Sequence, residues 1–526
     1  MSLVCNVPRT SSVVSKDIST TISSGNNVTV WLVVLFGAIG GILFGMDQAN
    51  FAGVETKESF ARSFCVVPKS TGNWGTLDEC LGRNDQEVPH GMTIFESWGS
   101  SLVQLGAAAG ALILGPPITS CFGRRAGLFI GSMIVTLAMI WSVSWTNLLS
   151  FYCSRFMTGL GVGIVTFALP MWTAELAPKE IRGALGCTMQ LAVVIGSQIA
   201  AGINIPQTVT WQNSLAAPIA PAVVVMLFIY FFPESPRHVF QTNGAQAART
   251  VLVKLRGTDQ VDAELNDIES SLSFETKQAP WSVLWTDPSI RRRVIIANML
   301  QWMQQFTGIN ALLGQGPKLY AASGIDLDPN VANFITNSFN LVGTIIMMVV
   351  IDKWGRRRLL LAGAVGMFFF MSSAGFLVYF FKSSLVAMWM LLGCCCLYFL
   401  SFAIAWGGIP WVYPSEIFPM DVKEKALSTS VCSQWIANWV VAFLTPYQID
   451  KWGSSDIRPA PTFFFYSIFI VFNFAFVYFY VPEIKGVALE DMDTIFGERQ
   501  YINTNAEKEA AYNQVSTPVV MIKELV

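Results

Sequence analysis

Long apolar stretches separated by short polar turns make up most of the chain. A helix rises 1.5 Å per residue, so about 20 apolar residues cross the hydrocarbon core of a bilayer. Twelve stretches reach this length, at residues 28–51, 93–118, 126–146, 149–175, 183–205, 214–233, 294–322, 331–351, 357–381, 386–416, 425–447 and 461–481. The pattern predicts an all-α membrane protein with twelve transmembrane helices.

Composition agrees with this prediction and excludes one class of partner. Of the 526 residues, 53% are hydrophobic and only 13% are charged, which is typical of a protein whose main partner is the lipid bilayer. The formal net charge of −2 leaves no basic face for a polyanion. We therefore expect no nucleic-acid partner.

Basic residues predict the orientation. They gather in alternate loops, as Arg124 and Arg125, Lys179 and Arg182, 291–293, Lys353 and 356–358, and Lys423 and Lys425. Loops rich in Lys and Arg stay in the cytoplasm. We expect these loops and both termini to be cytoplasmic.

A hydrophilic segment and an internal repeat divide the chain into halves. Glu175, Pro178 and Arg182 recur as Glu416, Pro419 and Lys423, each pair with the same spacing, and FGRR at 122–125 recurs as WGRR at 354–357. Duplicated halves of this kind are related by an axis along the membrane normal. The expected parts are a cytoplasmic N-terminal tail (1–27), an N-terminal six-helix bundle (28–233), a cytoplasmic helical linker (234–293), a C-terminal six-helix bundle (294–482) and a cytoplasmic C-terminal tail (483–526).

Eight motifs together resemble those of the sugar porter family of the major facilitator superfamily. They are GGILFGMD (40–47), FGRR (122–125), RFMTGLGVG (155–163), PESPR (233–237), QQFTGIN (304–310), DKWGRR (352–357), IPWVYPSEIFP (409–419) and PEIKG (482–486). The resemblance implies the major facilitator fold, with two six-helix bundles around a central sugar site. It also implies a multi-pass protein, with the plasma membrane as the expected location.

Asp47 is the single charge in the first apolar stretch. A carboxylate at that depth costs roughly 2.5–3.5 kcal/mol, so a partner is expected. The first span runs outward and the fourth inward, which places Arg155 at a matching depth and predicts an ion pair between them. In the family this pair is similar to the proton-coupling carboxylate and its arginine. The alternative is a structural salt bridge between two spans.

A sugar site should combine amides with aromatic rings, because hydroxyls need donors and acceptors while pyranose faces stack on flat rings. The resemblance implies as sugar contacts Gln190, Gln304, Gln305, Asn310, Asn340, Trp411 and Asn438. The alternative for any one of these amides is a hydrogen bond that merely joins two helices.

Two positions depart from the family pattern. Many sugar porters have two tyrosines where this chain has Gly314 and Gln315, and some glucose carriers place an acidic residue where this chain has Ala403. We therefore do not expect an aromatic gate on the outer side, and the substrate need not be glucose.

A set of charged residues is expected to pair across the cytoplasmic face and act as a gate: Arg124, Glu175, Arg182, Arg356, Arg357, Glu416 and Lys423. Their alternative role is to set the topology alone. Cys65 and Cys80 lie in a long exterior loop and form a possible disulfide. The remaining cysteines show no metal-ligand spacing, so we expect neither a metal nor a cofactor.

Transport by alternating access is the predicted function, with a monosaccharide or polyol as substrate and a proton as the expected coupled ion. The alternatives are a passive facilitator of a hexose, pentose or polyol, and a sugar sensor built on the same fold. An enzyme is not expected, because the two histidines, His90 and His238, lie in loops predicted on opposite sides of the membrane. The oligomeric state is left open.

Overall fold

The computed structural model describes residues 28–64, 91–176, 182–275, 279–323, 327–381, 385–419, 421–453, 459–487 and 492–497. Every regular element in these residues is helical. The fold is therefore all-α, as the hydropathy pattern predicts.

The N-terminal half contributes α1 (Val28–Val54), α2 (Glu58–Ser63), α4 (Gly91–Ala109), η1 (Gly110–Leu114), α5 (Gly115–Phe122), α6 (Arg124–Ser144), α7 (Leu148–Leu176), α8 (Arg182–Asn204), α9 (Trp211–Ala216), α10 (Ile219–Phe228) and η3 (Ile229–Phe231). Helices α11 (Pro236–Asn243), α12 (Ala245–Arg256), α13 (Asp262–Glu275) and α14 (Val283–Thr286) follow. The C-terminal half contributes α15 (Pro288–Gln305), α16 (Ile309–Ser323), α17 (Pro329–Trp354), α18 (Arg356–Phe380), α19 (Leu385–Ala405), α20 (Ile409–Ile417), α21 (Lys423–Gly453), α22 (Ala460–Tyr480) and α23 (Met492–Phe496).

Nine helical segments within the described residues are long and apolar enough to cross a membrane. The other three predicted spans coincide with α1, α8 and the consecutive pair α15 and α16. This arrangement fits the twelve passes of the major facilitator fold. The chain is a multi-pass membrane protein.

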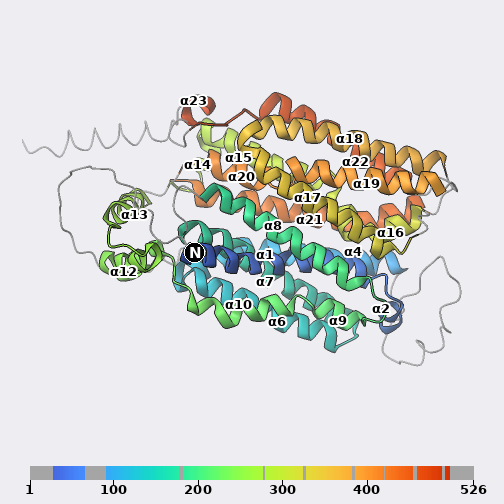
Figure 1. Cartoon of the computed structure of the whole chain (residues 1–526), viewed down its shortest axis with the longest axis horizontal. Coiled ribbons are helices and arrows are strands. Elements are labelled where there is room, and N and C mark those ends of the chain that lie inside the picture. Colours follow the sequence, from blue (N-terminus) through green and yellow to red (C-terminus); the bar gives the residue numbers. More distant parts are fainter. Residues whose placement is uncertain are drawn as a thin grey trace, which may run out of the picture.

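The helices form two stacked groups, with α1 to α10 in one and α15 to α22 in the other (Figure 1). Across the interface between the groups, α4 packs on α21 and α8 packs on α17. Helices α12 and α13 lie beyond one end of the stack, called here the linker end. The opposite end, where α1 ends and α2 lies, is called the distal end.

Glycines allow the closest helix contacts within the N-terminal group. A Cβ added at Gly45 would lie 1.8 Å from the Val193 carbonyl oxygen, and one at Gly159 would lie 2.1 Å from that of Val103. No side chain fits at such distances. Small residues of this kind let backbones approach closely where no hydrophobic effect drives helices together in lipid. They fix α1 against α8 and α4 against α7.

Two membrane helices in the C-terminal group are broken. Helix α15 ends at Gln305 and α16 begins at Ile309, with Gly308 between them at φ +90°. Helix α19 ends at Ala405 and α20 begins at Ile409 after two glycines. Interrupted helices leave backbone carbonyls without partners, which at membrane depth must be satisfied by protein. Both breaks lie in the spans predicted to carry the sugar site.

Candidate functional site: a polar pocket between the two halves

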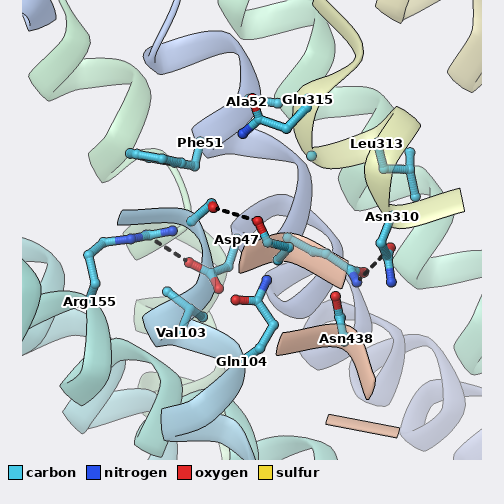
Figure 2. A pocket seen from close by; sticks show the side chains of 14 residues that line it. Asp47, Phe51, Ala52, Val103, Gln104, Arg155, Asn310, Leu313, Gln315 and Asn438 are labelled. Carbon is cyan, nitrogen blue, oxygen red and sulfur yellow. Dashed lines mark hydrogen bonds and ion pairs between the residues drawn. The ribbon is translucent and has the colours of Figure 1, made fainter. Parts of the chain in front are cut away.

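A pocket between the halves is lined mainly by α1, α4, α16 and α21 (Figure 2). Its space, counted together with the open solvent at its mouth, is about 480 Å³. The lining residues are Asp47, Gln48, Phe51, Ala52, Ser100, Val103, Gln104, Arg155, Asn310, Leu313, Gly314, Gln315, Asn438 and Ala442. Most of the polar groups are amides, which can both donate to and accept from a hydroxyl.

Asp47 and Arg155 meet in the wall of this pocket, as Figure 2 shows. Arg155 Nη1 lies 3.6 Å from Asp47 Oδ1, and both side chains are 3% exposed. Each residue lies about two turns from the distal end of its helix, which is why antiparallel α1 and α7 bring them to one depth. The structure thus brings together the two residues that the sequence places at matching depth.

Further contacts hold the arginine in addition to the ion pair. Arg155 Nε donates to the Gly99 carbonyl oxygen at 3.1 Å, and the guanidinium lies 4.8 Å from the centre of the Phe51 ring. Asp47 Oδ1 is buried and makes no hydrogen bond with any residue that the structure describes. A carboxylate held this way can take a proton and lose its attraction for the arginine without dismantling the arginine's own site.

Asn310 and Asn438 are the two predicted sugar contacts that line the pocket. Asn310 Nδ2 donates to Gln305 Oε1, so Gln305 orients Asn310 from behind. Across the pocket, Gln48 Nε2 donates to Asn310 Oδ1 at 3.3 Å, which joins α1 to α16. The two halves therefore share an amide pair at the site.

Sequence reasoning missed four polar residues of the lining: Gln48, Ser100, Gln104 and Gln315. Gln48 and Gln104 were detectable as amides within predicted apolar spans, and Gln48 directly follows Asp47. The sequence distinguishes Gln315 only as the residue that replaces a family tyrosine. In the structure it contributes an amide to the distal part of the pocket wall.

Gln304 lies outside the lining and supports a helix break. Its Nε2 donates to the carbonyl oxygens of Trp406 at 2.7 Å and Gly407 at 3.1 Å, which the break between α19 and α20 exposes. Its Oε1 accepts from Gln434 Nε2 at 2.7 Å. The Gln304 amide thus makes hydrogen bonds with three other residues.

We expect Gln304→Ala to lower the stability of the protein as well as transport. The substitution leaves the Trp406 and Gly407 carbonyls and the Gln434 amide buried without this partner, at about 1–3 kcal/mol for each group left unsatisfied. Asn438→Ala, at the pocket wall, is the matched control and should reduce transport with little change in melting temperature. Thermal unfolding in detergent measures the difference. A wild-type melting temperature for Gln304→Ala would contradict the supporting role.

The other predicted sugar contacts lie outside this pocket lining. Gln190 on α8 and Trp411 on α20 are half-buried, and Asn340 on α17 is buried. Gln190 Cγ lies 4.0 Å from the position that a Gly408 Cβ would occupy, so Gln190 faces the break between α19 and α20. Their contact with a sugar stays a prediction.

Charged residues of the predicted gate pair within each half at the linker end. Arg124 Nε lies 3.0 Å from Glu175 Oε2, and Arg356 Nη2 lies 2.8 Å from Glu416 Oε1. Arg357 Nη2 donates to the Tyr478 carbonyl oxygen at 2.7 Å. The remaining two members are Lys423, at the start of α21, and Arg182, whose side chain lies outside the described residues. Pairing between the halves stays a prediction.

His238 joins the gate network of the N-terminal half, which the sequence alone did not indicate. Its Nδ1 lies 3.3 Å from Arg124 Nη1. Burial lowers the pKa of the imidazole, and the Arg124 guanidinium lowers it further, against the opposing attraction of Glu234 and Glu175. The neutral ring suits this position, because an imidazolium would face a guanidinium.

Acidification should therefore destabilise the linker end. The pKa of His238 is lower in the folded protein than the ordinary value of about 6.5, so its stabilising contribution is present above pH 6.5 and is lost as the pH falls below it. We expect the melting temperature of the wild type to fall more steeply between pH 7 and pH 5 than that of His238→Gln. Parallel profiles would show that His238 does not carry this dependence.

The possible disulfide between Cys65 and Cys80 lies outside the described residues. Within the part of the chain that the structure describes, Cys153, Cys394, Cys395, Cys396 and Cys432 are free thiols. The same part holds no group of three or more His, Cys, Asp or Glu side chains placed to bind a metal ion.

The all-α fold, with two groups of helices and a polar pocket between them, is typical of a membrane transporter. Residues 33–496 match the family described as "Sugar (and other) transporter". The chain belongs to this family.

Relatives of known name are transporters as well. The chain is 28% identical over 490 residues to Sugar transport protein 11 of Arabidopsis thaliana, covering 90% of this chain and 92% of the relative. It is 30% identical over 494 residues to the probable glucose transporter rco-3 of Neurospora crassa, covering 90% and 80% of the two chains.

Solved structures confirm the major facilitator fold. The proton:xylose symporter XylE bound to 6-bromo-6-deoxy-D-glucose matches with a TM-score of 0.71 at 26% identity, covering 90% of this chain and all of that one. The partially occluded, inward-open form of XylE from E. coli matches with a TM-score of 0.70 at 25% identity, covering 88% of this chain and 100% of that one.

Proposed function

We propose that this protein carries a monosaccharide across a membrane by alternating access and couples its movement to a proton. One observation carries the proposal: the buried Asp47 and Arg155 pair lies in the wall of the amide-lined pocket between the two halves. A carrier must join its ion site to its substrate site, and here both share one cavity. The similarity to the proton:xylose symporter XylE supports the same reading.

The coupling would act through the charge of Asp47. A proton on Asp47 removes its attraction for Arg155, and the two helices that hold the pair, α1 and α7, can then adjust around the pocket. The amides of Gln48, Asn310 and Asn438 would hold the sugar hydroxyls in this state. Release of the proton on the other side would restore the ion pair and favour the empty carrier.

The proposed orientation places the linker end and both termini in the cytoplasm and the distal end outside, in the plasma membrane. Basic residues at the linker end, including Arg124, Arg125, Arg356 and Arg357, support this orientation. Protease accessibility of an epitope placed after residue 500, in sealed vesicles of known orientation, tests it.

Uptake of a radiolabelled sugar by intact cells or proteoliposomes tests the carrier and its coupling together. We expect accumulation above equilibrium, and we expect a protonophore to reduce uptake to equilibration. Accumulation that a protonophore leaves unchanged, or uptake that only equilibrates, would rule out proton symport and leave a passive facilitator. Competition by hexoses, pentoses, polyols and disaccharides against one transported label would define the substrate.

A further inference from the structure

A buried cluster at the distal end joins the two halves beyond the pocket. Lys318 on α16 lies between two carboxylates of the N-terminal half, Glu96 on α4 and Glu55 just after α1. Its Nζ is 3.6 Å from Glu55 Oε2 and pairs directly with Glu96 Oε1. The side chain of Glu55 is fully buried, that of Glu96 is 8% exposed and that of Lys318 is 20% exposed.

Two carboxyl groups and one ammonium group do not balance. Fully ionised, the cluster carries one net negative charge in a buried space, which is costly without a further partner. Besides Lys318, the partner of the Glu55 carboxylate is the side chain of Gln315, a neutral amide that adds no positive charge. The cluster becomes neutral when it holds one additional proton.

From this geometry we infer that the Glu55, Glu96 and Lys318 cluster is a proton-binding site, separate from Asp47, that takes up one proton when the two halves close at the distal end. Closing brings Lys318 of one half between the two acids of the other. Opening separates them and admits water, so that each charge is solvated and the extra proton leaves.

The titratable neighbours do not supply the missing positive charge. Arg155 on α7 interacts with Glu55 but is already paired with Asp47. Lys57 donates to the carbonyl oxygens of Pro206 and Val209, at 3.2 and 2.8 Å, and its charged neighbour is Asp328.

Burial raises the pKa of Glu55 to about 8, since loss of hydration outweighs the attraction of Lys318 and Glu96 adds repulsion. In an open, hydrated form the pKa of a glutamate returns to about 4.3. At any pH between about 4.3 and about 8, the closed form therefore binds the proton more tightly than the open form does. In that range, each unit by which the pH falls favours closing by up to about tenfold.

A distance measured across the distal end tests the inference on purified protein without sugar. Spin labels at Ser144→Cys, at the end of α6, and Phe381→Cys, just after α18, would report it, because both positions are exposed. The background is a variant with the ten native cysteines replaced. In the wild-type cluster we expect the ratio of closed to open protein to rise about fiftyfold from pH 8 to pH 6.

Variants of the cluster test how many protons are taken up when the distal end closes. E55Q or E96Q leaves one acid and one base, which are neutral together, so the ratio should no longer change between pH 8 and pH 6. K318Q leaves two acids and no base, so closing should require two protons and the pH dependence should steepen. E264Q, which changes an acid paired with Arg256 in the linker, is the control and should keep the wild-type profile.

A wild-type profile in E55Q or in E96Q would overturn the inference, as would a wild-type ratio that is flat across this range. If the labelled background does not fold, melting temperatures of the otherwise native protein decide instead. The wild type should lose stability relative to E55Q as the pH rises from 6 to 9, and equal profiles would overturn the inference. Only the consequence for transport rests on the proposed function, because both measurements are made without sugar. Failure of uptake would leave this result standing.

Discussion

Asp47→Asn should abolish sugar accumulation while preserving equilibration. The amide keeps the size of the carboxyl group but cannot exchange a proton, so the membrane potential can no longer drive the cycle. One charge moving through 100 mV releases roughly 2.3 kcal/mol, equivalent to about a fiftyfold gradient. We expect this entire gradient to be lost, whereas counterflow, the exchange of labelled for unlabelled sugar without net proton movement, should continue.

Asn438→Ala provides the contrasting control for this prediction, since it changes the pocket wall without touching the ion pair. It should raise the sugar concentration needed for half-maximal uptake and leave the final accumulation sensitive to a protonophore. Should Asp47→Asn still accumulate sugar above equilibrium, Asp47 would be a structural partner of Arg155 and the proton would travel elsewhere.

Arg155→Gln should be the most destabilising change in the pocket wall. It leaves the Asp47 carboxylate buried without its counter-charge, which typically costs about 3–5 kcal/mol. The double variant Asp47→Asn with Arg155→Gln should recover most of this loss, because neither remaining group is charged. The melting temperatures of the four proteins form a double-mutant cycle.

The same cycle separates the ion pair from the other contacts of the arginine. Arg155 also donates to the Gly99 carbonyl oxygen and lies over Phe51, so part of the loss should persist in the double variant. Equal stabilities for Arg155→Gln and the double variant would mean that the charge of Asp47 contributes nothing to the defect. In that event, the pair would not be the electrostatic unit on which the coupling depends.

Hydropathy predicted the helices because lipid requires long apolar segments whatever their tertiary contacts. The pairing of Asp47 with Arg155 was predictable, because the number of residues between each of them and the outer membrane surface gives its depth in the membrane. The two depths match in antiparallel spans. Both inferences use only the position of a residue along the membrane normal, which can be estimated from the sequence.

The rotation of each helix about its own axis could not be predicted in this way. The depth of Gln304 predicts a sugar contact, which stays a prediction, but depth does not show that its amide also donates to the carbonyls freed at Trp406 and Gly407. Glu55, Glu96 and Lys318 come from three helical regions far apart in the sequence. No local sequence pattern indicates that their side chains lie together. Such groupings follow from packing between the halves.

The hydrogen bond between Gln48 and Asn310 also bears on how tightly any cargo can be held. A sugar hydroxyl that binds to these amides replaces the hydrogen bond that they make with each other in the empty site. The binding free energy gained is therefore only the small difference between two similar hydrogen bonds. Loose binding of this kind prevents the cargo from becoming trapped halfway across. A mutation that removed this internal competition could bind sugar more tightly and yet turn over more slowly.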